Sequence, residues 1–248
     1  MRPGATGALL ALGAFAAPLA AHAAPGLTLM HAAPAGGGGE AYSLDVQTLL
    51  IITALAFLPA IILLMTGFTR IIIVLAILRQ ALGLSQTPPN LVLIGLALAL
   101  TAFVMHPVIS RVNGQALQPY LAGNLGFKAA VARAETPLRG FMQRQTRKGA
   151  LHLFVDMNGK HYRSVSQVPF TVLVPAFATS ELQTAFQLGF LIYIPFVLID
   201  LAVSSILMSL GMIMLSPMLI SLPLKLLLFV SISGWDLVLG SLARSFVH

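Results

Sequence analysis

Three charged side chains, Glu181, Asp200 and Lys225, lie in a predominantly apolar stretch over residues 175–235. A membrane-spanning helix needs about 20 apolar residues, so this stretch has room for a hairpin of two spans. A turn at residues 211–212, midway between Asp200 and Lys225, would bring the acid and the base to the same depth. Charged side chains at such depth are costly and often mark functional positions.

Asp200 and Lys225 allow three interpretations. An ion pair that holds the hairpin, or neighbouring subunits, in register is favoured; a proton relay and separate snorkelling to water are the alternatives. Glu181 lies within Ser180-Glu-Leu-Gln183, a pattern typical of a capping box at the start of a helix. An acid in the first turn would stabilise the helix dipole, and a further role for Glu181 stays open.

Methionines gather around the expected turn, at positions 208, 212, 214 and 218. Such residues usually fill a core. A methionine is also unbranched and deformable, so a ring of methionines could seal a pore and yield to a passing chain.

No enzymatic constellation accompanies these residues. The six histidines have no ligand-like spacing, and the sequence has no cysteine, no phosphate-binding loop and no paired carboxylates within one segment. We therefore expect neither an enzyme nor a bound cofactor or metal.

The composition indicates an integral membrane protein. Of the 248 residues, 58% are hydrophobic and 8% are charged, whereas soluble domains average about 25% charged residues. Most of the +7 net charge comes from residues 110–185, which we expect to lie outside the cytoplasm, so nucleic acid is not an expected partner.

Five regions follow from hydropathy and composition. Residues 1–23 predict a signal peptide, cleaved after Ala21-His22-Ala23. Residues 24–45 predict a flexible linker, 46–109 a first transmembrane hairpin, 110–185 an extracytoplasmic domain, and 186–248 a second transmembrane hairpin with a C-terminal tail. The predicted fold class is all-α, with two long helical hairpins and a mainly helical extracytoplasmic insert.

The predicted spans cover approximately residues 46–65, 90–105, 188–207 and 212–231. Thr87-Pro88 and Thr136-Pro137 each predict a helix start, because threonine caps helices well and proline fits the first helical position. Pro107 is expected to end the second span. Residues 151–155 and 161–165 could form a strand hairpin around Asn158-Gly159, although a helical domain is favoured.

The expected topology places the mature N-terminus outside, residues 67–89 inside, 110–185 outside, and the turn near Gly211 inside. Arg70 and Arg79 support it through the positive-inside rule.

Several motifs together resemble the FliP family of flagellar type III export-gate proteins. They are MTGFTRIIIV at 65–74, PPN at 88–90, PAFATSEL at 175–182, PFVLIDL at 195–201, LPLK at 222–225 and GWDL at 234–237. The similarity covers roughly residues 43–247, with the motifs in the family's order and spacing.

The resemblance implies a pore-forming subunit that conducts unfolded flagellar proteins across the bacterial inner membrane during flagellum assembly. It further implies a homo-oligomeric ring of about five copies, with FliQ, FliR, FlhA and FlhB type subunits as partners in the flagellar basal body. The family's methionine-rich constriction falls on Met212, Ile213 and Met214, with Met208 nearby, and isoleucine replaces the common middle methionine. Asp200, Lys225 and Glu181 fall on the family's charged positions.

Two alternative functions remain. A virulence-type (injectisome) secretion subunit would share these motifs, although the signal peptide favours the flagellar branch. A small-solute transporter or channel could use Asp200 as a gating charge, but it should show inverted repeats and polar ligands at mid-membrane.

Overall fold

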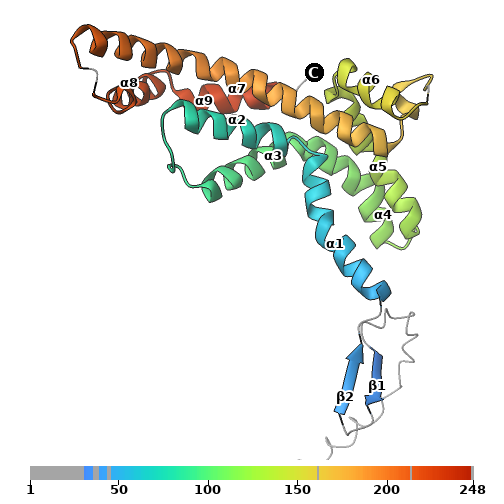
Figure 1. The fold of residues 1–248 in the computed structure, drawn as a ribbon. Helices are drawn as coiled ribbons and strands as arrows, with labels where there is room; N and C mark the ends of the chain where they lie inside the picture. The colour runs from blue at the N-terminus through green and yellow to red at the C-terminus, as the bar shows by residue number, and fades with distance from the viewer. Residues whose placement is uncertain (1–30, 36–38, 44–45, 161, 213, 247–248) are drawn as a thin grey trace, which may run out of the picture. The chain divides into compact units, whose positions relative to one another are not determined.

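The computed structural model describes residues 31–35, 39–43, 46–160, 162–212 and 214–246 (Figure 1). The predicted signal peptide and its cleavage site lie outside the described residues. The chain divides into two units, Met1–Phe57 and Leu58–His248.

The smaller unit contains two short strands in the segment predicted to be a flexible linker. Strand β1 (His31–Ala35) pairs antiparallel with β2 (Gly39–Ser43), with His31 opposite Ser43. A two-stranded sheet consists only of edges, which is where Pro34 can lie without disrupting a central ladder. The described part of this segment is therefore not irregular.

Helix α1 (Val46–Leu64) follows and runs across the division between the two units, in agreement with the predicted first span. Its apolar side chains, such as Leu50 and Phe57, are largely exposed.

The larger unit is built around α2 (Phe68–Ala81), which packs against α3 (Asn90–Val112) and α7 (Phe170–Ser209) (Figure 1). Ile71, Val74, Leu75 and Leu78 of α2 are almost fully buried. Their spacing of three and four residues places them on one face, which explains why this short helix occupies the centre of the core.

The region between α3 and α7 is helical, as favoured, but its helix boundaries differ from the predicted ones. Helix α3 continues through Pro107, and a π-helical turn η1 (Asn113–Leu117) joins it to α4 (Gln118–Leu121). Helix α5 (Phe127–Gln145) contains Thr136-Pro137 in its interior, so these residues do not start a helix. Helix α6 (Lys148–Met157) takes the place of a strand hairpin, and a 3₁₀ turn η2 (Val165–Gln167) precedes α7.

Helix α7 has 40 residues and contains both Pro175 and Pro195. At 1.5 Å per residue it is about 60 Å long, roughly twice the thickness of the hydrocarbon core. Ser180 to Gln183 lie well inside it, so the predicted capping box is wrong. The expected region boundaries at 109/110 and 185/186 likewise fall within continuous helices.

Helices α8 (Pro217–Ser231) and α9 (Gly234–Arg244) complete the chain. By length and hydropathy, two helical segments could cross a membrane, Asn90–Leu121 and Phe170–Ser209. The count rises to four if Leu49–Leu64 with Phe68–Ala81, and Pro217–Ser231 with Gly234–Arg244, are each one bent span. These findings confirm an all-α membrane protein.

Candidate functional site at the two hairpin turns

Two helical hairpins of the larger unit end in turns of the same kind. The first hairpin is α2 with α3, and the second is α7 with α8. In the first, Gly83 has a φ of +78°, the Gly83 amide donates to the Gln80 carbonyl and the Leu84 amide to that of Arg79. In the second, Gly211 has a φ of +72°. Its amide donates to Met208, and the Met212 amide donates to Leu207 at 2.9 Å.

Both are Schellman motifs, in which a glycine adopts the left-handed conformation and satisfies the last carbonyls of the helix. The predicted turn at residues 211–212 is therefore confirmed. Figure 1 shows both turns at the left-hand end of the larger unit.

The methionines around the second turn face solvent within the single chain. Met214 is 100% exposed, Met208 66% and Met212 42%. Ile213 lies outside the described residues. These methionine side chains therefore do not fill the core of their own chain, although clustered methionines usually do.

Asp200 and Lys225 form an ion pair within one chain. The Lys225 ammonium donates to Asp200 Oδ2 at 2.6 Å, and the Ser221 hydroxyl donates to Oδ1 at 2.5 Å. Asp200 lies on α7 and Lys225 on α8, on opposite sides of the turn. This geometry agrees with the prediction that the two charges lie at the same depth and form an ion pair. The lysine side chain is only 4% exposed, whereas the aspartate is 35% exposed.

The turn of the first hairpin lies against this ion pair. A Cβ built on Gly83 would stand 3.6 Å from Met218 Cε and 4.0 Å from Lys225 Nζ. The two hairpins therefore meet at Lys225, and the positive φ of Gly83 makes a side chain there unfavourable.

Glu181 has a buried partner that the sequence analysis did not assign. Arg70 donates from Nε to Glu181 Oε2 at 2.8 Å and from Nη2 to Oε1 at 2.5 Å, a bidentate pair. The arginine side chain is 2% exposed and that of the glutamate 0%. Because Glu181 lies in the interior of α7, a role in stabilising the dipole at a helix start is wrong.

The remaining donors of Arg70 are also satisfied. Nη1 donates to the carbonyl and hydroxyl of Ser245, and Nη2 donates to Gln145. The guanidinium also lies 3.9 Å from the ring centroid of Phe246. Arg70 thus joins α2 to α5, α7 and the C-terminal segment.

Charged residues in two otherwise apolar helices, Arg70 in α2 and Glu181 in α7, were the available signal for this pair. They are 111 residues apart, and nothing in the sequence specifies that separation as a contact.

This contact also shows how α2 lies along α7. Helix α2 runs beside α7 from Arg70 at Glu181 to Ile77 at Gly189, so the two helices are parallel. Arg70 lies at the end that holds Gln145 and Ser245, opposite the two turns. It therefore lies at the other end of α2 from the turn of the first hairpin, and the predicted topology stays a prediction.

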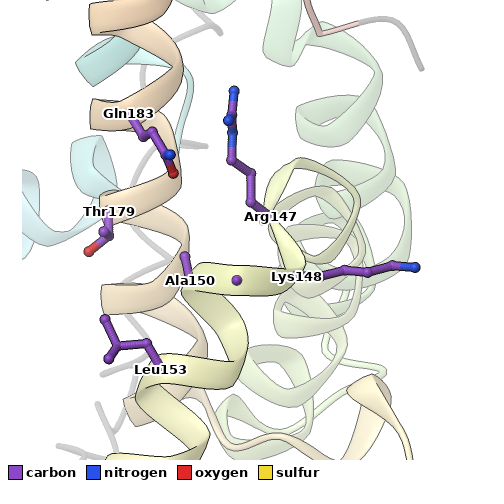
Figure 2. A pocket seen from close by; sticks show the side chains of 7 residues that line it. Arg147, Lys148, Ala150, Leu153, Thr179 and Gln183 are labelled. Carbon is purple, nitrogen blue, oxygen red and sulfur yellow. The ribbon is translucent and has the colours of Figure 1, made fainter.

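A hollow of about 670 Å³ lies where α6 meets α7. Figure 2 shows Arg147 beside α7 at the level of Gln183, whereas Lys148 points away from that helix. The Arg147 guanidinium donates to Thr184 and Gln187, and its backbone amide donates to Ser180. These bonds fix α6 on α7, and within the described ranges no three acidic or histidine side chains gather as metal ligands.

Residues 51–242 match the model of the FliP family. The chain belongs to this family. The match includes the Arg70–Glu181 and Asp200–Lys225 ion pairs and both hairpin turns.

Relatives named flagellar biosynthetic protein FliP agree with this assignment. The protein of Pectobacterium carotovorum subsp. carotovorum is 53% identical over 214 residues, which cover 86% of this chain and 83% of the relative. That of Cereibacter sphaeroides is also 53% identical, over 85% of this chain and 70% of its own. The Bacillus subtilis (strain 168) protein is 48% identical over 84% of this chain and 94% of its own.

Proposed function

We propose that this chain is a pore-forming subunit of the flagellar type III protein export gate. It conducts unfolded flagellar proteins across the bacterial inner membrane while the flagellum is assembled. Membership of the FliP family is the observation that carries this proposal. The relatives bear a flagellar name, which favours this function over an injectisome subunit or a small-solute transporter.

We further propose that the chain acts as one of about five copies in a ring, within the basal body in the inner membrane. FliQ, FliR, FlhA and FlhB type subunits are the partners that the family implies. Support comes from the large apolar side chains that remain exposed on the single chain, such as Phe190, Leu201 and Leu227. Large apolar side chains exposed in such number call for contact with lipid or with other subunits.

We assign the pore constriction to Met212, Ile213 and Met214, with Met208 beside them. Support comes from the exposure of the three methionines at the end of a hairpin, where copies related by a ring axis could meet. The flexible thioether can close the conduit at rest and repack around a chain in transit. In this role the residues act by contact and not by chemical catalysis, so the protein is not an enzyme.

We assign Asp200, Lys225 and Glu181 to assembly of the gate. Lys225 and Glu181 are buried and paired within the chain, so they hold the hairpins in the shape that a neighbouring copy would meet. This role does not require any of the three to move a proton.

Complementation tests the function directly. A flagellated bacterium lacking its own family member should regain swimming in soft agar, and release flagellar proteins into the medium, when it produces this chain. Membranes that contain the chain without any restored secretion would contradict the proposal.

The constriction is tested in the same strain with Met212→Gln/Met214→Gln. Amides at the proposed constriction should change the amount of flagellar protein secreted or the leakage of ions through the resting conduit, because they replace apolar contacts by hydrated groups. Met157→Gln is the matched control, since Met157 is 74% exposed but lies at the end of α6. Equal effects of the two changes would contradict the assignment.

A further inference from the structure

A cavity of about 620 Å³ opens at a site that the export role does not use. It lies between α3, α5 and the C-terminal segment. Phe103 and Pro107 line it from α3, Phe141 and Arg144 from α5, and Arg244 and Phe246 from the end of the chain. Its volume falls within the range of pockets that hold small organic ligands.

The apolar walls of this cavity are held in place by the core. The rings of Phe141 and Phe246 stack with centroids 6.4 Å apart and an interplanar angle of 22°. The Phe246 carbonyl accepts from Gln145 at 3.1 Å, and its ring packs under the Arg70 guanidinium. The cavity is therefore already formed without a ligand.

Two arginines at the cavity differ from the other arginines nearby. Arg70, Arg139 and Arg147 all donate to side chains or carbonyls of the same chain. Arg144 and Arg244 are exposed and make no hydrogen bond or ion pair with another described residue. Two guanidinium groups that have no partner among the described residues and lie beside an apolar cavity suit a ligand with an anionic head and an apolar body.

The position along α3 indicates what such a ligand is. Helix α3 begins at Asn90, and about 20 residues at 1.5 Å each cover the hydrocarbon core. Phe103 and Pro107 then lie in its last two turns before the polar boundary, and the basic residue Arg111 follows. An apolar groove that opens at this depth meets the upper acyl chains and the phosphates of a bilayer.

We infer that this cavity binds an anionic phospholipid of the membrane in which the chain is inserted. The acyl chain packs along Phe103, Pro107 and Phe246, and the phosphate lies between Arg144 and Arg244. Guanidinium groups favour this arrangement because their planar N–H pairs match phosphate oxygens bidentately. The inference stands independently of protein export, since it rests on the cavity, the two arginines and the hydropathy of α3.

Lipid selectivity of the reconstituted full-length chain tests the inference. Spin-labelled phosphatidylglycerol and spin-labelled phosphatidylcholine are compared in phosphatidylcholine vesicles, and the motionally restricted fraction of each is measured. The wild-type chain should retain phosphatidylglycerol preferentially. Arg144→Gln/Arg244→Gln should lower that preference by about tenfold, given the usual contribution of basic residues at a membrane surface.

Two further variants keep the test specific. Arg133→Gln is the control, because Arg133 is exposed, has no ion pair among the described residues and lies three turns from Arg144 on α5. It should leave the preference unchanged. Arg144→Lys/Arg244→Lys keeps the charge and should retain part of the preference even if the glutamine variant folds poorly.

Three results would overturn the inference. The first is a wild-type chain with no preference for phosphatidylglycerol, and the second is an equal loss in Arg133→Gln. The third is a glutamine double variant that keeps the lipid preference but no longer assembles with other copies, which would assign these arginines to a protein contact.

Discussion

A guanidinium buried among apolar helices needs an acceptor for each of its five N–H groups, and Arg70 finds them all. Glu181 accepts two of these bonds, and Gln145 and the two oxygens of Ser245 accept the others. Such a pair is not automatically stabilising, because both ions lose their hydration. When both partners are present, the pair and its hydrogen bonds fix α2, α5, α7 and the C-terminal segment relative to one another.

Arg70→Gln should therefore be strongly destabilising. It leaves Glu181 buried without a counter-ion, which typically costs about 3–5 kcal/mol. Thermal unfolding of the detergent-solubilised chain, followed by circular dichroism, measures the loss. Arg79→Gln is the control on the same helix, because Arg79 is partly exposed and bonds Pro88 and Asn90 near the turn.

The control should cost no more than about 1 kcal/mol, as is usual for exposed polar contacts. Removing both charges at once, in Arg70→Met/Glu181→Leu, should recover much of the lost stability, since no unpaired ion remains. A double variant as unstable as Arg70→Gln would show that the hydrogen bonds to Gln145 and Ser245, and not charge compensation, dominate at this position.

The second ion pair should respond unequally to loss of its two members. Asp200→Ala leaves an ammonium that is 4% exposed without a partner, whereas Lys225→Ala leaves a carboxylate that is 35% exposed and can still reach water. We expect Asp200→Ala to be the more damaging change to folding and to ring assembly on native gels. The exchange Asp200→Lys/Lys225→Asp should recover part of the loss, and normal assembly of both single variants would mean that the pair is not structural.

Among the helices and turns, the sequence predicted those features that depend on local residue types. The apolar runs became helices, and the glycine between Asp200 and Lys225 became the turn. Helix ends were missed at Pro107, Thr136-Pro137 and Ser180, because local start and stop signals were given more weight than packing. An interior proline costs about 3 kcal/mol, which the burial of a long apolar helix can exceed.

Contacts between distant segments were predicted only in part. Asp200 and Lys225 flank one turn, so symmetry about that turn was enough to suggest their pairing. Arg70 and Glu181 belong to different hairpins, and the parallel alignment of α2 with α7 follows from the shape of both surfaces. No periodicity in either segment specifies that alignment.

Gly189 determines how closely α2 and α7 approach each other. A Cβ at this position would clash with the Ile77 side chain. Gly189→Ala should therefore destabilise the chain by about 1–3 kcal/mol through overpacking, despite the better helix propensity of alanine. Chemical unfolding measures this, and Ile77→Ala in the same chain should relieve the clash.

Gly95→Ala is the matched control for this packing. Gly95 also lies inside an apolar helix, but a Cβ there would meet nothing within 4 Å. It should be neutral or stabilising by up to about 1 kcal/mol. If Gly189→Ala behaved in the same way, α2 and α7 would not be in close contact at this point.

For the molecule as a whole, the proposed constriction is the feature that a single chain would leave incomplete. Met212 and Met214 lie at the turn of the second hairpin. The described residues of their own chain leave both side chains exposed. In a ring of copies they would meet around the axis. Met212→Ala/Met214→Ala removes several apolar contacts per subunit and should leave a gap large enough for ions.

Leakage of small ions in cells that produce the double alanine variant measures this effect. Ile213→Met should close normally, because isoleucine and methionine are similar in volume and such exchanges are usually well tolerated. The more deformable side chain should, if anything, seal better around a chain in transit. Unchanged conductance in a double alanine variant that still assembles would place the seal elsewhere in the chain or on a partner subunit.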